Sequence, residues 1–544
     1  MKMVKSLLLG SAAGLVAVSA GQAADLPVKA KPVEYVKVCS LYGAGFYYIP
    51  GTDVCLKLGG FLRTEWNIHA AGSFATFFAG GNANQTRTED NYITRARGYI
   101  TTDVREQTSY GTLRAYLAAG WQYSSDDSPT ISLPGTQATP SSTTTTFTGG
   151  GNSNLSLLRA FIQFGGFTFG KTASFYDFLN TSKYTLQTQL YQDYAGVGIF
   201  TYGYTQQLGN GIAATIAVQD QSPFVHPLCQ FAPGTAQECL DFSAGGALPS
   251  TNNTAGNLVP DIVGAIRLDQ AWGGAQVAAI AHDLRAQYYT APLVQTIGNP
   301  AFIPGNGSSH PNDKWGFAVM GGLELNLDQF WGGWFSKGDS WVVQSQYCVG
   351  ETYSCVNTGG TRLNDVMFSL YNPNKIGIGW ADEAFFTGLG GADNGLQLAT
   401  MWNVYTGIQH YWTPDVHTSL YGGFFSYQAN STDVDNFVCA VLNHGGVGHN
   451  TPGIVGTIHG SFAVSNTGCA DWQAWQIGSR TLWNPVRNLD VGVDVLYTSM
   501  AKSAFEGATV QLNVPTSTAG VANVAVGDTH IWSGILRIQY NFYP

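Results

Sequence analysis

The segment from Tyr92 to Arg105 carries all of its charged side chains on one parity. Its odd positions include Arg95, Arg97, Asp103 and Arg105, and no even position is charged. Successive side chains of a β-strand point to opposite faces, so the pattern predicts a strand with one polar and one apolar face. A charge on the lipid face of a membrane barrel costs about 2–4 kcal/mol at the midplane, so a barrel wall requires this segregation. A strand of a soluble sandwich also alternates, but its wet face would rarely carry a row of arginines.

Similar alternation recurs along the chain and predicts an all-β fold. Residues 56–67 place Arg63 and Glu65 on one parity, and residues 112–121 place Arg114 opposite a row of Leu and Ala. In residues 157–164 the apolar side chains occupy even positions, from Leu158 to Phe164. The strands expected after the Gly165-Gly166 turn begin near Phe167 and then cover residues 198–207, 212–219, 261–268, 275–284, 314–325, 340–347, 396–409, 416–427, 472–483, 490–498 and 529–542. About sixteen strands result, which predicts a transmembrane antiparallel β-barrel, because bacterial barrels have an even number of strands.

Short turns are expected at one end of this barrel. The predicted turns are Leu208–Gly211, Thr413–Asp415, Asn484-Pro485 and two similar segments, Leu268–Gly274 and Leu327–Gly333. Long connections alternate with them, as in outer-membrane barrels with short periplasmic turns and long external loops.

Composition excludes several other classes of protein. Charged residues are 11% of the 544, against about 25% in soluble domains. No segment of about 18 consecutive apolar residues follows the N-terminus, which excludes helical membrane spans. The net charge of −10 argues against nucleic acid as a partner.

The N-terminus predicts export. Lys2 and Lys5 precede an apolar run from Leu7 to Ala20, and small residues follow it. This is the pattern of a secretory signal peptide, expected to span residues 1–23, with cleavage after Ala23 or Ala24.

The segment from Ala24 to Cys55 resembles the opening of the alphaproteobacterial outer-membrane porin family. The shared pattern is ADLPVKAKPVEYVKVC followed by YG, GF, YIPGTD and a second Cys. The resemblance implies a periplasmic segment at residues 24–55 and a porin β-barrel at residues 56–544. It also implies a sixteen-stranded homotrimer in the bacterial outer membrane, in contact with membrane lipid and lipopolysaccharide. The function implied is a water-filled channel for passive diffusion of small hydrophilic solutes and ions.

A constriction is expected where the alternation stops at Gly170. A strand, a short turn, a strand and then a charged loop resemble the eyelet-loop region of general bacterial porins, so we expect residues 171–196 to fold into the lumen. Arginines on the first four strands would face acids on this loop, and Arg95 and Arg97 would lie at heights comparable with Arg63 and Arg114. The predicted constriction residues are Arg63, Arg95, Arg97, Arg114, Arg159, Lys171, Asp177 and Asp193. Opposed charges would order water and orient dipolar solutes.

Eight cysteines fall into four pairs of near neighbours. In an exported chain an even count indicates disulfides, and local pairing is the economical hypothesis, although free thiols in loops stay an alternative. The expected pairs are Cys39–Cys55, Cys229–Cys239, Cys348–Cys355 and Cys439–Cys469.

No motif in the sequence predicts catalysis. GxGxxG, P-loop, HExxH and GxSxG patterns are absent, and the ten histidines have no metal-ligand spacing. We therefore expect no enzyme, cofactor or metal site, and Glu65 and Asp103 are interpreted as salt-bridged lumen residues. A passive channel is favoured over an outer-membrane enzyme or adhesin. A substrate-specific channel, for a sugar or another small solute, remains the alternative.

Overall fold

The computed structural model describes residues 37–69, 92–125, 152–179, 181–187, 198–231, 253–287, 310–330, 333–356, 367–372, 375–387, 395–430, 470–504, 506–507, 509–513 and 521–542. The predicted signal peptide lies outside these residues.

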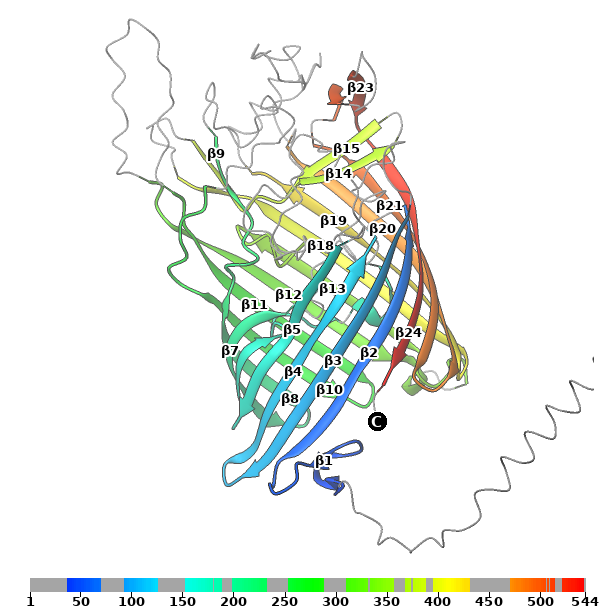
Figure 1. The fold of residues 1–544 in the computed structure, drawn as a ribbon. Helices are drawn as coiled ribbons and strands as arrows, with labels where there is room; N and C mark the ends of the chain where they lie inside the picture. The colour runs from blue at the N-terminus through cyan, green and yellow to red at the C-terminus, as the bar shows by residue number, and fades with distance from the viewer. Residues whose placement is uncertain are drawn as a thin grey trace, which may run out of the picture.

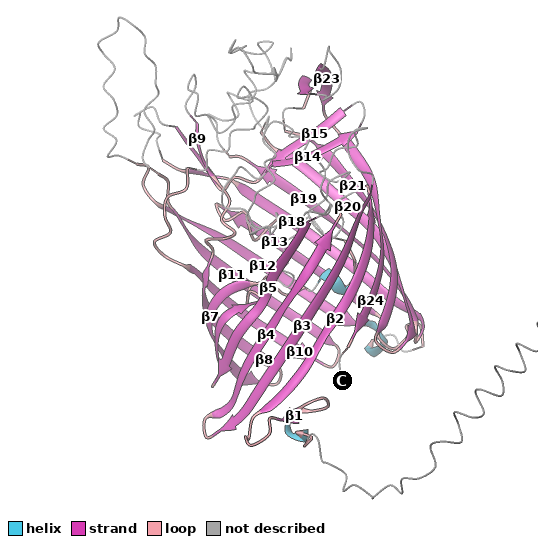
Figure 2. Ribbon diagram, viewed as in Figure 1, coloured by secondary structure: helices cyan, strands magenta, loops and turns pink. Residues whose placement is uncertain are grey.

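Sixteen antiparallel strands form a closed barrel (Figures 1 and 2). The barrel closes because β24 pairs with β2 as well as with β21. This confirms the predicted fold class. The wall strands are β2 (Cys55–Ile68), β3 (Tyr92–Thr108), β4 (Gly111–Ser124), β5 (Asn152–Phe164), β6 (Phe167–Thr172), β7 (Ile199–Gly209), β8 (Ile212–Asp220), β10 (Asp261–Gln270), β11 (Gly273–Leu284), β12 (Lys314–Asn326), β13 (Ser340–Val349), β18 (Thr400–Thr413), β19 (Val416–Gln428), β20 (Trp472–Val486), β21 (Leu489–Lys502) and β24 (Thr529–Asn541).

Shorter elements lie at the two ends of the wall, and η2 lies inside the barrel. β1 pairs with the start of β2, and small sheets join β14, β15, β22 and β23, and β9, β16 and β17. Their bounds are η1 (Ser40–Tyr42), β1 (Tyr47–Tyr48), η2 (Thr181–Lys183), β9 (Leu228–Phe231), η3 (Leu327–Gln329), β14 (Met367–Asn372), β15 (Lys375–Trp380), β16 (Ala384–Thr387), β17 (Gln397–Leu398), β22 (Thr509–Asn513) and β23 (Val521–Val526).

Short turns and long connections alternate along the wall. We call the end with the short turns the periplasmic end, as in outer-membrane barrels, and the other end the outer end. β1 lies at the periplasmic end, and β14, β15 and β23 lie at the outer end (Figure 1). At the Gly165-Gly166 turn, φ angles of 57° and 90° explain why glycine occupies both positions.

Two predicted turns differ in the structure. The β20–β21 turn is Arg487-Asn488, with Asn488 at φ 71°, whereas Asn484 and Pro485 lie within β20 at a register shift. A proline cannot donate to a strand ladder, so a bulge accommodates it better than regular pairing. The Leu327–Gly333 segment is not a short turn either, because it begins a longer connection that contains η3 and reaches Ser340.

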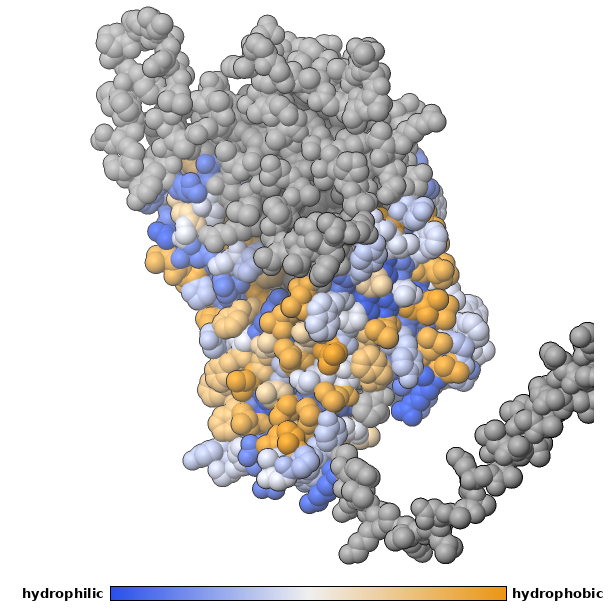
Figure 3. Space-filling model, in the orientation of Figure 1, coloured by the Kyte–Doolittle hydropathy of each residue, from blue (hydrophilic) through white to orange (hydrophobic). Residues whose placement is uncertain are grey.

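Large apolar side chains cover the outside of the wall. On β3, β8 and β24, for example, Ile100, Ile216 and Trp532 are 49%, 63% and 59% exposed. Hydrophobic residues gather over the wall in the space-filling view (Figure 3). Strand parity therefore separates an apolar outer face from a polar inner face, as the sequence predicts.

β5 departs from simple parity at a bulge. Ala118 of β4 pairs with Arg159 but Ala119 pairs with Leu157, so Leu158 has no direct partner. Beyond the bulge, Leu155 and Leu157 take the exposed positions, while Ile162 keeps the predicted one. Leu158 is half-buried at the bulge, and the predicted even-position pattern ends there, because an extra residue in one strand reverses the parity beyond it.

Two predicted disulfides are present. Cys39–Cys55 closes the segment that precedes β2, and Cys348–Cys355 closes the segment that follows β13. Cys229 is also disulfide-bonded. Cys239, Cys439 and Cys469 lie outside the described residues.

Candidate functional site: the lumen loop and the arginine wall

The chain after β6 leaves the wall and enters the barrel. We call residues 173–179 and 181–187 the lumen loop. At its start, Gln276 of β11 donates from Nε2 to the carbonyls of Tyr176 at 3.1 Å and Asp177 at 3.3 Å. The amide of Leu179 donates to Oε1 of Gln344, on the inner face of β13, at 3.1 Å.

The end of the lumen loop reaches the strands that close the barrel. Asp494 of β21 accepts through Oδ2 from the amide of Leu186 at 2.6 Å and from Oγ1 of Thr185 at 2.9 Å. The guanidinium of Arg537, on β24, donates to the carbonyl of Leu186 at 2.7 Å. The loop therefore crosses the lumen from the β11–β13 side to the β21–β24 side, which confirms the predicted inward fold for its described residues.

Glycines on the inner wall make room for the apolar side chains of the loop. A Cβ built on Gly322 of β12 would lie 2.2 Å from the Phe178 ring, and one on Gly492 of β21 would lie 2.8 Å from Leu186. Real Cβ atoms essentially never approach so closely. A larger residue at Gly322 would meet the Phe178 ring and would push the loop away, whereas one at Gly492 would meet Leu482 of β20 first, at 2.4 Å.

A charged cluster lies where the lumen loop meets β24. We call Arg63, Arg95, Arg97 and Arg537 around Glu65 the arginine cluster. Glu65 accepts at Oε1 from Nε of Arg537 at 2.6 Å and at Oε2 from Nε of Arg95 at 2.5 Å, and Arg63 lies 3.6 Å from Oε1. Three guanidiniums thus share one carboxylate and that of Arg97 lies nearby, so the cluster is strongly positive.

Arg63 and Arg97 form the least compensated pair of the cluster. They are direct register partners on β2 and β3, although like charges opposite one another destabilise a sheet. Each guanidinium lies over an aromatic ring, Arg63 over Phe61 at 4.8 Å and Arg97 over Tyr99 at 5.2 Å, and the two rings stack. Such cation–π contacts hold the charged groups against the wall.

Arg114 lies nearer the periplasmic end than predicted. It pairs with Arg105, eight residues beyond Arg97 along β3. Both Arg114 and Arg105 make bidentate contacts with Asp103, at 2.7–3.0 Å. The expectation that Arg63, Arg95, Arg97 and Arg114 share one height is therefore wrong, because strand register places Arg114 at a second, lower position.

The other predicted constriction residues occupy different surroundings. Arg159 pairs in register with inward-facing Ala118, and its guanidinium donates to the carbonyl of Leu158. Lys171 pairs with Phe200, whose ring lies on the outer face, and its Nζ contacts the carbonyl of Leu157 at 2.9 Å. The register does not favour a lumen position for Lys171, and its role stays a prediction.

The two predicted acids of the loop differ in what the structure shows. Asp177 is half-buried and lies near the start of the lumen loop, where its carbonyl accepts from Gln276. Asp193 lies outside the described residues. The structure brings Arg63, Arg95 and Arg97 together, and it joins their group to the loop through Leu186.

Sequence analysis missed Arg537, Arg480, Asp494 and Glu324 as site residues. Arg480 of β20 donates to the carbonyl of Ser182 at 3.0 Å, and Oε1 of Glu324, on β12, accepts from the Tyr184 hydroxyl at 2.9 Å. Arg480 shares its parity with Gln476, and Arg537 shares its parity with Gln539. The parity rule applied to every strand would have placed these charges in the lumen, but it could not have paired them with the loop.

The described residues contain neither a metal-binding cluster nor a membrane-spanning helix. No group of three or more His, Cys, Asp or Glu side chains there has metal-binding geometry. No helix in the same part of the chain is long and apolar enough to cross a membrane.

Comparisons with known proteins give the chain a family. Residues 25–535 match the model of the Porin subfamily. Porin Omp2b of Brucella melitensis is 29% identical over 343 residues, which cover 60% of this chain and 82% of that protein. Porin Omp2b of Brucella neotomae is 31% identical over 296 residues, covering 53% and 68%.

A solved structure supports the fold. The outer membrane channel DcaP of Acinetobacter baumannii superposes with a TM-score of 0.50 at 12% identity, over 91% of this chain and 99% of that one. The barrel, its inward loop and the family match agree with one another. The chain belongs to the porin subfamily of bacterial outer-membrane proteins and is an outer-membrane channel for passive diffusion.

Proposed function

We propose that the lumen loop narrows the channel beside the arginine cluster, that solutes pass along the part of the cluster that the loop leaves open, Arg63 and Arg97, and that this passage is the constriction and selects for anions. The observation that carries the proposal is the contact of Leu186 with Arg537, which sets the loop beside four guanidiniums and one carboxylate. Fixed charges in a narrow, low-dielectric passage attract counter-ions and repel like-charged ions strongly. Small hydrophilic anions should therefore permeate faster than cations of equal size.

Arg63 and Arg97 are the residues to test. Replacing both with Gln should shift the permeability ratio toward cations, because it removes two positive charges without breaking the Glu65 contacts of Arg95 and Arg537. Reversal potentials across a salt gradient in planar bilayers measure the ratio. Lys337→Gln is the control, since it removes a positive charge from an exposed residue at the periplasmic end.

Asp177 provides the reverse test. Asp177→Asn should shift the ratio toward anions, because it removes an acid from the loop opposite the wall. If neither substitution moves the reversal potential, the constriction is elsewhere in the channel. Arg95 is a poorer target, since its guanidinium is buried against Glu65 and its loss would disturb the wall.

We also infer that the protein is a homotrimer of side-by-side barrels in contact with lipid and lipopolysaccharide. The support is the family and the outer faces near the barrel closure, where Trp66 packs on Tyr92 with ring centroids 5.0 Å apart and Trp532 packs on Tyr497 at 4.9 Å. Rigid aromatic surfaces of this kind suit protein contact. Native mass spectrometry from mild detergent should give three chains per particle, and a single-chain mass would contradict the inference.

A further inference from the structure

A buried polar network lies at the outer end of the barrel, away from the arginine cluster. Asp261 begins β10, and His282 lies near the end of β11. Glu351 and Tyr353 follow β13, and Glu383 directly precedes β16. All five are at most 2% exposed.

One imidazole holds this network together. His282 contacts Oδ1 of Asp261 through Nδ1 at 2.6 Å and Oε2 of Glu383 through Nε2 at 3.4 Å. The hydroxyl of Tyr353 donates to Oδ2 of Asp261. The contacts tie two parts of the β13–β18 connection, residues 350–356 and 381–387, to the rims of β10 and β11. We call these two parts the latch segments.

The latch segments lie inside the outer mouth of the barrel. Nδ2 of Asn403, on the inner face of β18, donates to the carbonyl of Cys355 at 2.5 Å. The hydroxyl of Tyr427, on β19, donates to the carbonyl of Asp382 at 3.1 Å. Cys355 and Phe385 belong to the same buried apolar cluster as Tyr176 of the lumen loop. The latch segments therefore occupy part of the passage, and Glu351 lies close enough to Tyr176 of the lumen loop for the two groups to interact electrostatically.

The network holds more acid than base. Asp261, Glu351 and Glu383 are buried with His282, and no lysine or arginine of the described residues forms an ion pair with these three acids. Oε2 of Glu351 accepts no hydrogen bond. Its Oε1 accepts from the hydroxyl of Ser354, which carries no charge. A buried carboxylate without a counter-charge is expelled toward water or takes up a proton. The closed arrangement must therefore bind protons that the solvated groups would release.

Burial makes the acids of the latch segments bind protons more tightly. Desolvation, strengthened by the charge of Asp261, raises the pKa of Glu351 well above its usual value, and desolvation also raises the pKa of Glu383. Desolvation lowers the pKa of His226 to about 3, so this second imidazole adds no positive charge at neutral pH. The other titratable or charged groups around the network are Tyr176, Asp283, Arg285, Asp313, Tyr353 and Asp382.

We propose that the latch segments form a proton-controlled gate, folded into the lumen while the network holds its protons and released from it when the protons are lost. This inference rests on the proposed channel function. A carboxyl group that binds protons more tightly in the closed state favours closure as pH falls and opening as pH rises through its closed-state value. Loss of the proton of His282 acts in the same direction, since it leaves Asp261 and Glu383 without a counter-charge.

Single-channel conductance of the full protein in planar bilayers, with the pH of both chambers varied from acid to alkaline, tests the gate. The wild-type conductance should rise with pH. The variant E351Q/E383Q should stay at the low conductance over the pH range in which the wild type opens, because its neutral amides imitate the protonated acids and only loss of the His282 proton remains to release the latch segments. The control D328N/D415N removes two acids at the periplasmic end and should keep the wild-type pH dependence.

The second variant weakens the hold of the network on the latch segments. Y353F removes the hydroxyl that binds Asp261, so the conductance transition should move to lower pH. A wild-type conductance that is constant with pH would overturn the gate while leaving the channel function intact. The same pH dependence in E351Q/E383Q as in wild type would also overturn it. Absence of conductance at every pH, in a barrel that is folded by circular dichroism, would instead contradict the channel function.

Discussion

At the scale of single residues, Glu65 organises the arginine cluster. Its two oxygens bind Arg95 and Arg537, which come from the strands on either side of β2. Its side chain is fully buried, and that of Arg95 is 2% exposed. An ion pair taken out of water in this way is costly to break, because the remaining charges stay buried without a partner.

Glu65→Gln should therefore destabilise the barrel by about 3–5 kcal/mol. The measurement is the temperature at which the folded form, visible by its mobility in SDS gels, converts to the unfolded form. Asp269→Asn is the control, because the Arg267–Asp269 pair is 42% and 61% exposed. Exposed pairs contribute about 0–1 kcal/mol, so equal shifts in the two variants would show that Glu65 is not a central counter-charge.

At the scale of elements, the lumen loop is held by side chains from distant strands. β11, β13, β21 and β24 each supply a hydrogen bond to it. Gly322 of β12 supplies the space for Phe178. The position of the loop is thus a property of the closed wall and not of the loop sequence alone.

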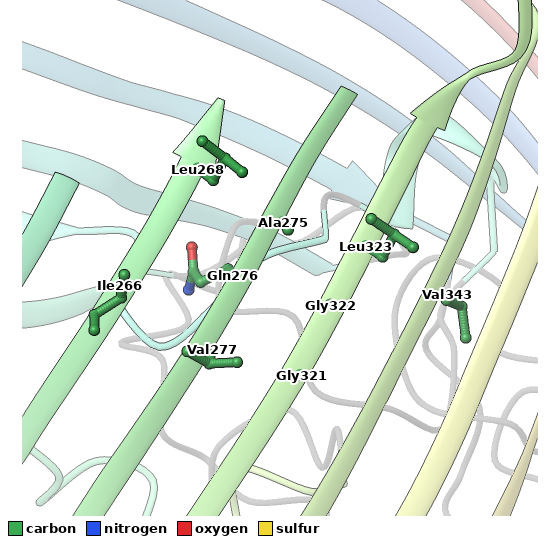
Figure 4. A pocket seen from close by; sticks show the side chains of 9 residues that line it. All are labelled: Ile266, Leu268, Ala275, Gln276, Val277, Gly321, Gly322, Leu323 and Val343. Atoms are coloured by element: carbon green, nitrogen blue, oxygen red, sulfur yellow. The ribbon is translucent and has the colours of Figure 1, made fainter. Parts of the chain in front are cut away.

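Gly322→Val should displace the lumen loop and raise single-channel conductance, because the added side chain would occupy the place of the Phe178 ring. Gly321→Val is a matched control on the same strand. A Cβ on Gly321 meets no atom within 4 Å, and this residue lines a shallow apolar hollow with Ile266, Val277 and Val343 (Figure 4). Equal conductance in the two variants would show that Phe178 does not position the loop.

At the scale of the whole molecule, membrane residence depends on the separation of the two faces. Ile216 is 63% exposed on the outer face of β8, whereas its neighbour Thr215 binds Thr205 through their hydroxyls at 2.9 Å. Ile216→Lys should cost about 2–4 kcal/mol of folding free energy in lipid. Thr215→Lys should cost less, since its ammonium would lie on the water-facing side. Urea titrations of folding into lipid vesicles compare the two, and a larger cost at Thr215 would reverse the assignment of faces.

Local pattern alone was enough to predict much of this molecule. The parity of charges in β2 and β3 predicted which side chains face the lumen, since the alternation of side chains is a local property of extended backbone. Glycine pairs and Thr413–Asp415 predicted turns, because the φ angles that tight turns require are also local. The stop at Gly170 predicted where the chain leaves the wall. The two described disulfides join near neighbours, so the sequence predicted them as well.

Only the tertiary structure decided how these parts meet. The bulge at Leu158 and the pairing of Arg105 with Arg114 depend on strand register, and register is a relation between segments. The contacts of Leu186 with Asp494 and Arg537 join residues about 300 positions apart or more. No periodicity within one strand encodes such contacts, because they arise when the sheet closes and brings its first and last strands beside the loop.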